Sequence, residues 1–319
     1  MQGLPLTRRA RWTGAACALA VLAIWTSFIL IARTSARHAL TPFDIAFLRF
    51  LFSGLVVLPL AAWRWQALKN GLGGSAAWRR GALLAGTAGI GYCTLAYSGF
   101  FFAPAAHAAV LMPGSLPLWT ALIATLLLGE RLTPTRAAGL ALIFGGDLLV
   151  GGSSLLAAFE GGSTWKGDAL FLAVGISWST YGVLCRRWRV GAIDATLAIA
   201  LGCLVAYVPL YALLAGAGIV PSGLAAASWR EIGFQAVYQG GFAMLVAGLA
   251  FTQVVATFGP VRTTMMTAMV PALAALAAVP LLGEPLTPAA LGGLVCVTAG
   301  LLLGLRRTAL RPALTERAA

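Results

Sequence analysis

The sequence predicts an all-α polytopic membrane protein with ten transmembrane helices that form two inverted five-helix repeats. Of its 319 residues, 60% are hydrophobic and 10% are charged, and the mean hydropathy is +0.89, whereas about 25% of the residues of a soluble domain are charged. Apolar runs close to the ~20 residues that a helix needs to cross a bilayer recur along the chain. Part of the first half is also nearly repeated in the second half.

The apolar runs define the ten expected spans. They lack the period-two alternation of a barrel strand, and helices are then the only way to satisfy the backbone in lipid. Between the third and fourth spans the only break is "FFFAPAA", where we expect a tight hairpin at Ala103 and Pro104. The spans cover residues 12–32, 43–63, 81–101, 105–128, 134–153, 167–185, 195–215, 232–252, 263–282 and 287–305.

The net charge of +13 would suggest a nucleic-acid partner on a soluble protein, but the placement of the charges indicates orientation instead. With the N-terminus in the cytoplasm, seventeen Lys and Arg residues fall on cytoplasmic segments, four fall on outer segments, and only Arg49 lies within a span. This is the positive-inside bias, so we expect both termini in the cytoplasm and no nucleic-acid partner. The first apolar run exceeds the 7–15 residues of a signal-peptide core, so we expect it to be retained.

The repeat is clearest around two turns. "LLLGERLTP" at 126–134 returns as "PLLGEPLTP" at 280–288, and residues 117–149 match residues 271–303 at 16 of 33 positions. Because five spans is an odd number, the second repeat crosses the membrane in the opposite sense, an arrangement found in secondary transporters. We expect residues 1–153 to form the first repeat, 154–166 a glycine-rich linker, 167–305 the second repeat and 306–319 a basic cytoplasmic tail.

The repeated turns each contain a glutamate, Glu130 and Glu284. In both, a Thr-Pro pair reads as an N-cap followed by proline in the first helical turn. The glutamates have two interpretations: a structural role, accepting backbone N–H groups or pairing with an arginine, or an end gate whose bonds break as the protein opens. We favour the structural role because both residues lie at the membrane surface.

Residues 95–150 and 269–304 resemble the EamA domain of the drug/metabolite transporter superfamily. Within it the overall pattern is most similar to bacterial aromatic amino acid exporters. This resemblance implies ten helices, two inverted repeats, a central cavity used by alternating access and a place in the bacterial inner membrane. It is carried by a proline in the fourth span of each repeat, the LLGE turn and a glycine in the fifth span, which are Pro117, Glu130 and Gly139, then Pro271, Glu284 and Gly293.

Aromatic, amide and methionine side chains within the spans are the candidates to line that cavity. Tyr and Trp offer an apolar wall with a polar handle, and Met packs adaptably. The alternative is that the aromatic residues belong to the belt at the membrane interface. The candidates are Tyr92, Tyr97, Met112, Trp119, Trp178, Tyr181, Tyr238, Gln239 and Met244.

Three ionisable residues within the spans are candidates for charge recognition or coupling. Arg49 either meets a substrate carboxylate or extends its charge toward the interface. His107 is either a packing residue or a proton relay. Asp147 is either a proton-coupling carboxylate or an exposed interfacial residue near the outer mouth, and we favour the exposed placement because its counterpart in the second repeat is Leu301.

The function that the sequence supports best is a secondary transporter or facilitator that exports small metabolites, above all aromatic and other apolar amino acids. Sugars, nucleotide precursors and cationic drugs are alternative cargoes, although the first span lacks the glutamate that marks small cationic-drug exporters. An intramembrane enzyme or scaffold would need a catalytic cluster at depth, and the sequence indicates none. We therefore expect a monomer that contacts lipid and a small-molecule substrate, with no cofactor and no metal.

Overall fold

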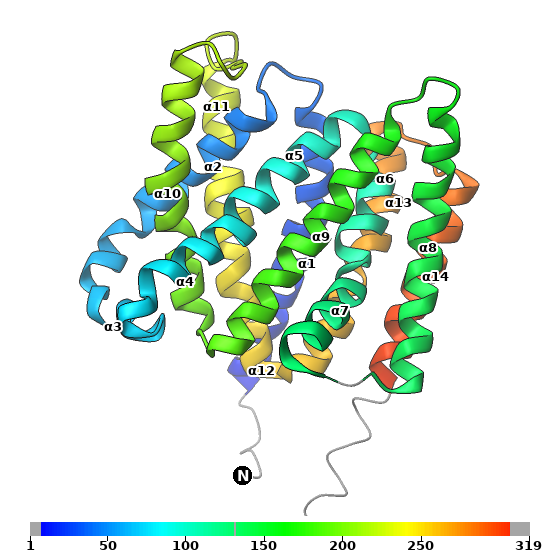
Figure 1. Ribbon diagram of the computed structural model, residues 1–319, viewed down its shortest axis with the longest axis horizontal. Helices are drawn as coiled ribbons and strands as arrows, with labels where there is room; N and C mark the ends of the chain where they lie inside the picture. The colour runs from blue at the N-terminus through cyan, green and yellow to red at the C-terminus, as the bar shows by residue number, and fades with distance from the viewer. Residues whose placement is uncertain (1–7, 131, 307–319) are drawn as a thin grey trace, which may run out of the picture.

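The computed structural model describes residues 8–130 and 132–306, and these residues form helices and connecting turns without a strand. Figure 1 shows the helices running between two ends of the molecule. The first half contains α1 (Arg8–Ser35), α2 (Pro42–Trp63), α3 (Trp65–Gly71), η1 (Gly74–Ala76), α4 (Ala77–Leu84), η2 (Ala85–Gly91), α5 (Tyr92–Phe102), α6 (Ala105–Ala109), η3 (Val110–Gly114), α7 (Leu116–Leu128) and α8 (Pro134–Ala158). The second half contains α9 (Thr164–Trp188), α10 (Ala192–Gly216), α11 (Trp229–Gln235), η4 (Ala236–Val246), α12 (Ala247–Thr267), α13 (Val270–Leu282) and α14 (Pro288–Arg306).

Eight helical segments of the described chain are long and apolar enough to cross a membrane. The last expected span is the shorter apolar helix Pro288–Gly304. The third expected span is built from α4, η2 and α5 in succession, and the expected hairpin at Ala103 and Pro104 separates α5 from α6. The chain is thus a multi-pass membrane protein. The qualifying segments are Arg11–Ser35, Pro42–Trp63, Ala105–Leu128, Pro134–Ala158, Thr164–Trp188, Ala192–Gly216, Trp229–Gly259 and Met265–Leu282.

Two boundaries differ from the sequence prediction. The helix α8 continues to Ala158, so the expected linker at 154–166 shortens to residues 159–163. Residues 153–158 contain no helix breaker, and the chain turns only near Gly161, whose φ is +88°. Apart from Arg306, the expected tail at 306–319 lies outside the described residues, as does Arg131.

The two glutamate turns lie at opposite ends of the molecule, which confirms the inverted repeat. The α7–α8 turn is at the lower end in Figure 1 and the α13–α14 turn is at the upper end. Each follows a left-handed glycine, Gly129 (φ +69°) or Gly283 (φ +66°). Each precedes a threonine N-cap, since Thr133 accepts from Arg136 N at 3.4 Å and Thr287 accepts from Ala290 N at 3.1 Å. We call the two ends the Glu130 end and the Glu284 end.

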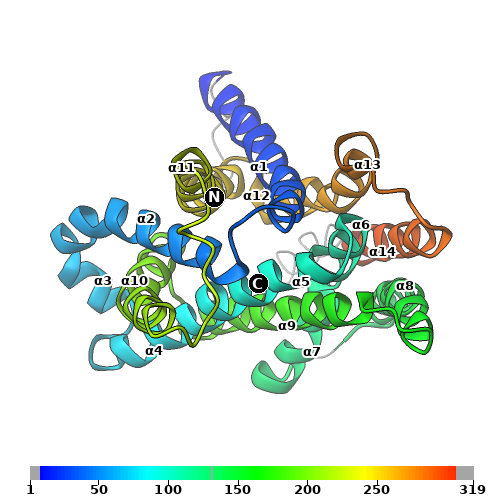
Figure 2. The ribbon, with the colours of Figure 1, turned by 90° about the horizontal axis from the view of Figure 1, so that it is seen from above.

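Helices α8 and α14 pack together at one edge of the molecule, where Figure 2 shows them side by side. Glycines bring the two backbones close. A Cβ added at Gly139 would lie 2.8 Å from Gly300 O, and one added at Gly146 would lie 2.7 Å from Gly293 O. Gly139 and Gly293 are equivalent in the two repeats, as are Gly146 and Gly300, so this contact itself obeys the internal symmetry.

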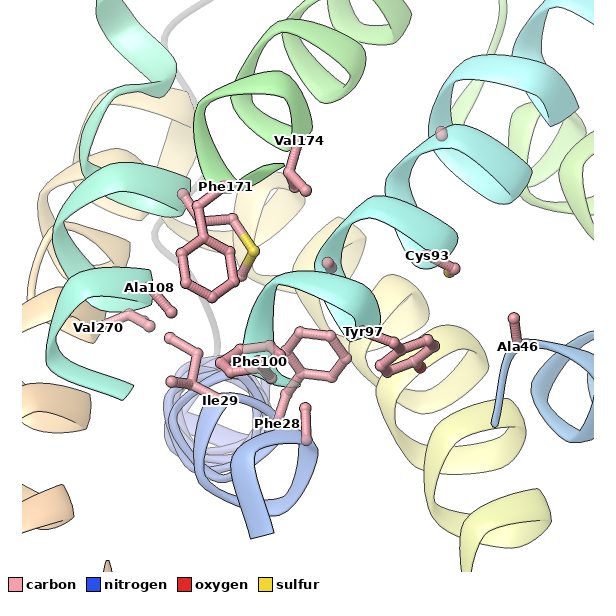
Figure 3. Packing of buried hydrophobic residues seen from close by; sticks show 14 of the residues in the cluster. Phe28, Ile29, Ala46, Cys93, Tyr97, Phe100, Ala108, Phe171, Val174 and Val270 are labelled. Atoms are coloured by element: carbon pink, nitrogen blue, oxygen red, sulfur yellow. The ribbon is translucent and has the colours of Figure 1, made fainter. Parts of the chain in front are cut away.

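The interior between the repeats is apolar and aromatic. Figure 3 shows Phe28 of α1 beside Tyr97 and Phe100 of α5, and Ala108 of α6 facing Val270 of α13. Phe28 lies 6.0 Å from Tyr97 and 6.5 Å from Phe100, measured between ring centroids. These rings fill the interior toward the Glu284 end.

Candidate functional site

A cavity of about 120 Å³ is bordered by residues of both repeats. A water-sized site needs ~10–15 Å³ by this measure, so the cavity accommodates about ten non-hydrogen atoms. The lining residues are Trp25, Phe28, Ile29, Arg49, Tyr92, Met112, Pro113, Leu116, Trp178, Ala243 and Val270.

Two π-helical segments contribute residues to the cavity lining, and a third ends directly before a lining residue. Tyr92 directly follows η2, Met112 and Pro113 lie within η3, and Ala243 lies within η4. A π segment holds an extra residue per turn and so redirects the side chains beside it, which is why such segments are frequent at functional sites. The segments η2 and η4 occupy corresponding positions in the two repeats, so the widening of the helix is a property of both halves.

Aromatic rings form one wall of the cavity. Tyr92 lies 4.9 Å from Trp178, and its ring is 6.4 Å from that of Phe28, measured between centroids. Trp178 also packs on Tyr181 at 5.1 Å, one turn further along α9. The rings of both Trp178 pairs are tilted by 53° to each other, and such contacts fix the orientation of the rings that line the cavity.

Arg49 is the cation of the cavity. Its side chain is buried, with 6% of the residue exposed, so the sequence alternative of a charge extended to the interface is wrong. The guanidinium lies 5.9 Å from the Phe28 ring centroid and donates from Nη1 to Tyr97 Oη at 3.3 Å. Its Nε is buried without an acceptor, and no acidic side chain of the described residues forms an ion pair with it.

From Arg49 a chain of hydrogen bonds runs toward the Glu284 end. Tyr97 Oη donates to Gln239 Oε1 at 3.0 Å, and Gln239 Nε2 donates to Gln235 Oε1 at 3.2 Å. Gln235 Nε2 then donates to Ser35 Oγ at 2.6 Å, in the last turn of α1. We call the four side chains of Tyr97, Gln239, Gln235 and Ser35 the polar ladder.

The Glu284 end is closed by a partly buried ion pair. Arg33 Nε donates to Glu284 Oε1 at 2.6 Å, and Arg37 Nη2 lies 3.4 Å from the same oxygen. The second carboxylate oxygen accepts the backbone N–H of Ala105 at 2.8 Å. Glu284 therefore ties its own turn to the end of α1 and to the start of α6.

The Glu130 end carries the equivalent ion pair, which is more exposed. Glu130 pairs with Arg186 at the end of α9, and Arg136 Nη1 lies 3.7 Å from its other oxygen. The cavity residues toward this end, such as Trp25, Tyr92 and Trp178, are half-buried, whereas Phe28, Tyr97 and Phe100 toward the Glu284 end are buried. The cavity is therefore closed more tightly toward Glu284. Both glutamates pair with arginine, which agrees with a structural role and equally with an end gate that is closed in this state.

His107 is paired with an acid that the sequence did not single out. Its Nδ1 lies 2.9 Å from Asp168 Oδ1, and Ser154 Oγ lies 3.5 Å from the same nitrogen. All three residues are buried, so they form a polar cluster that the sequence analysis did not identify. In a Ser-His-Asp nucleophile the serine and the acid bind opposite ring nitrogens, so this cluster lacks that geometry.

Asp147 lies away from the cavity lining and is buried, with 6% of the residue exposed. Its expected exposed placement is wrong. Asp147 follows Gly146, at which α14 approaches the backbone of α8 closely. Both carboxylate oxygens of Asp147 are buried without a hydrogen-bond partner among the described residues.

Of the nine residues predicted to line a cavity, Tyr92, Met112 and Trp178 do so. Tyr97 and Gln239 belong to the polar ladder, and Tyr181 stands behind Trp178. The others lie elsewhere: Tyr238 shares a 2.6 Å hydrogen bond with Ser27, Trp119 packs over Gly175, and Met244 packs against the apolar core. Ser35, Gln235, Asp168 and Arg33 were missed, since nothing in the local sequence marks their distant partners.

An inverted repeat of membrane helices around a cavity at the repeat interface defines the class of secondary transporters. The model of the EamA-like transporter family matches residues 12–152 and 165–306, so the chain belongs to this family of membrane transporters. No curated protein matches the chain. A solved structure titled "Crystal structure of protein" has a TM-score of 0.53 and 22% sequence identity, and the match covers 91% of this chain and 95% of that chain. At that identity the likeness concerns the fold alone.

Proposed function

We propose that this transporter exports amino acids with aromatic or other large apolar side chains across a bacterial inner membrane. The observation that carries the proposal is Arg49, a buried guanidinium without an acidic partner in an aromatic cavity. A buried charge without a counter-ion is costly, and in a membrane such a residue is by default functional. A substrate carboxylate would supply the missing anion.

The aromatic residues of the cavity lining would contact the side chain and the ammonium group of the substrate. Tyr92, Trp178 and Phe28 form a surface on which an aromatic or branched side chain packs. An α-ammonium group is attracted to the same ring faces by cation–π interaction, worth ~0.5–2 kcal/mol. The cavity volume of about 120 Å³ suits a small molecule better than a peptide.

The alternative cargoes fit these contacts less well. A cationic drug would be repelled by Arg49 at close range, and nucleotide precursors carry several charges that a single guanidinium does not balance. Sugars would leave Arg49 without an anion. An amino acid, with one carboxylate, one ammonium and an apolar body, matches the groups present.

The charge distribution supports an orientation with both termini in the cytoplasm, because the seventeen basic residues on one side follow the positive-inside rule. The Glu284 end then faces outward and the Glu130 end faces the cytoplasm. The tightly closed outer end and the less buried inner wall describe a state that accepts substrate from inside, as an exporter requires. In this scheme residues 1–153 and 167–305 act as the two halves that rock around the cavity.

The proposal is tested by uptake and exchange in proteoliposomes with a panel of radiolabelled amino acids, with and without a pH gradient. We expect exchange of phenylalanine, tryptophan, tyrosine and leucine, and no exchange of phenethylamine or tryptamine, which lack the carboxylate. Indifference to every amino acid, or equal transport of the decarboxylated amines, would overturn the proposal. Dependence of accumulation on the pH gradient would distinguish a proton-coupled carrier from a facilitator.

A further inference from the structure

The polar ladder connects the cavity to the Glu284 end through an otherwise apolar interior. Arg49, Tyr97, Gln239, Gln235 and Ser35 follow one another at hydrogen-bond distances of 2.6–3.3 Å. They are between 0% and 6% exposed. The ladder therefore lies between the cavity and the closed Glu284 end. Its first member, Tyr97, is bonded to Arg49, the residue to which we assign substrate recognition.

Every link of the ladder donates in the same direction. Arg49 donates to Tyr97, Tyr97 to Gln239, Gln239 to Gln235 and Gln235 to Ser35, which finally donates to the backbone oxygen of Ile31 at 2.7 Å. The buried amides thus satisfy one another without water. This matters because a buried polar group without a partner costs about 1–3 kcal/mol.

Packing alone does not explain the amides. The corresponding segment of the first repeat, residues 77–91, contains neither Gln nor Asn, so the fold is built there without amide side chains. The pair of buried amides, Gln235 and Gln239, is consequently a feature of the second repeat only. In a membrane interior, polar side chains that the fold does not require mark substrate paths.

Neutral side chains that hydrogen-bond to one another suit a surface that is dehydrated in the closed state and hydrated in the open state. An apolar wall would be costly to hydrate when that half opens, and a charged wall would be costly to dehydrate when it closes. Amide and hydroxyl groups bind one another in the closed state and exchange those bonds for water in the open state at little net cost.

We propose that the polar ladder is the closed half of the transport path. When α11 and η4 separate from α1 and α5, the side chains of Tyr97, Gln239, Gln235 and Ser35 become a hydrated wall along which the polar head of the substrate moves from Arg49 to the Glu284 end. This inference rests on the proposed transport function and adds to it a route and the side chains that specify that route.

The first test measures the accessibility of the ladder without any substrate. The five native cysteines are replaced, Gln235→Cys or Ser35→Cys is introduced singly, and a membrane-impermeant maleimide is applied from the Glu284 side. We expect slow labelling when Glu284 is present and labelling at least tenfold faster when Glu284→Gln is added. A protein that retains only Cys203, which is buried on α10, should stay unlabelled in both backgrounds. Equal, slow labelling of both ladder positions in the two backgrounds would overturn the proposal.

The second test separates a path from a packing role. Gln239→Leu keeps the volume and removes the ladder bonds, so we expect transport to fall at least tenfold while the Kd for substrate changes less than threefold, because Arg49 is unaltered. Gln253→Leu is the matched control, since Gln253 is exposed on α12 of the same span and bonds only locally to Thr257. Wild-type transport by Gln239→Leu would overturn the proposal. A different outcome is that Glu284→Gln speeds the labelling of the ladder cysteines as expected but the wild-type protein transports no amino acid. That outcome would overturn only the proposed amino acid substrate.

Discussion

Arg33 Nε lies 2.6 Å from Glu284 Oε1 at one end of the protein, and Arg186 pairs with Glu130 at the other end. The arginines are 153 positions apart and the glutamates are 154 positions apart, so the two ion pairs are equivalent under the internal repeat. They differ in environment. The side chains are 20% and 10% exposed in the Arg33 pair but 48% and 35% exposed in the Arg186 pair. The two ends carry the same kind of ion pair, but the pair at the Glu284 end is less exposed. This difference indicates that the Glu284 end is the more tightly closed of the two.

Replacing Glu284 should open that end. Glu284→Gln removes a charge that binds Arg33, Arg37 and the N–H of Ala105, and a hydrogen bond to a charged group is worth about 1.5–3 kcal/mol. We expect a roughly ten- to hundredfold increase in the rate at which an impermeant thiol reagent, applied from the Glu284 side, reacts with Met112→Cys in the cavity.

Glu130→Gln is the natural comparison for this variant. Its ion pair is more exposed, and exposed pairs contribute about 0–1 kcal/mol. We therefore expect less than a fivefold change in labelling of the same cysteine from the Glu130 side. If the two glutamine variants changed accessibility equally, burial would not govern which end is closed.

Replacing Arg49 should weaken substrate binding without lowering the stability of the protein. Arg49→Gln removes the cation from the cavity, so we expect binding of carboxylate substrates to weaken roughly ten- to hundredfold, with a smaller loss for Arg49→Lys, which keeps the charge but not the planar fork. The empty Arg49→Gln protein should be as stable as the wild type or more stable, because a buried charge without a counter-ion is costly. Equilibrium binding and thermal unfolding in detergent measure the two quantities. A simultaneous loss of both would assign Arg49 to the fold.

The aromatic wall should select the side chain of the substrate. Trp178→Leu removes one ring from the stack with Tyr92, and an aromatic contact is worth about 0.5–1.5 kcal/mol beyond its area. We expect the affinity for phenylalanine to fall about three- to tenfold and that for leucine to fall less, in competition assays. Trp188→Leu is the control on the same helix, because Trp188 packs against Arg80 away from the cavity and should leave both affinities unchanged.

The helices and their inversion could be predicted from the sequence because both depend on local patterns. Apolar runs predict the membrane-spanning helices, and the GE-x-LTP turns at Glu130 and Glu284 indicate the internal repeat. The left-handed glycines and threonine caps follow from the same few residues. A helix end is harder to place when no breaker is present, which is why α8 extends past its expected limit to Ala158.

The site was only partly predictable because its contacts join distant segments. Tyr97 and Gln239 are 142 positions apart, and His107 and Asp168 are 61 apart. Hydrophobic periodicity does not reveal the π segments that turn Tyr92 and Met112 toward the cavity. Asp147 was misplaced because its burial depends on the approach of α14, which its own flanking sequence does not encode.

The buried pair of His107 and Asp168 should show energetic coupling. His107→Gln and Asp168→Asn each replace one partner of the 2.9 Å contact with a neutral amide of different geometry, so we expect each to lower the free energy of unfolding by about 1–3 kcal/mol. The double variant should cost less than the sum by at least 0.5 kcal/mol, measured by denaturation in detergent. His38→Gln is the control, because His38 is exposed beyond the end of α1 and should change stability by less than ~0.5 kcal/mol. Additive effects would mean that the pair contributes no interaction energy.

Two adjacent glycines on α8 should respond oppositely to the same substitution. A Cβ at Gly146 would meet Gly293 O at 2.7 Å and Val297 Cγ2 at 2.9 Å, whereas a Cβ at Gly145 meets nothing within 4 Å. Because backbone cannot move aside as a flexible side chain does, Gly146→Ala forces α8 from α14 and should cost about 1–3 kcal/mol. Gly145→Ala gains up to ~1 kcal/mol of helix propensity and should be neutral or stabilising. The comparison is made by thermal unfolding in detergent, and an equal response of the two variants would contradict the close α8–α14 contact on which the symmetric packing of the two repeats depends.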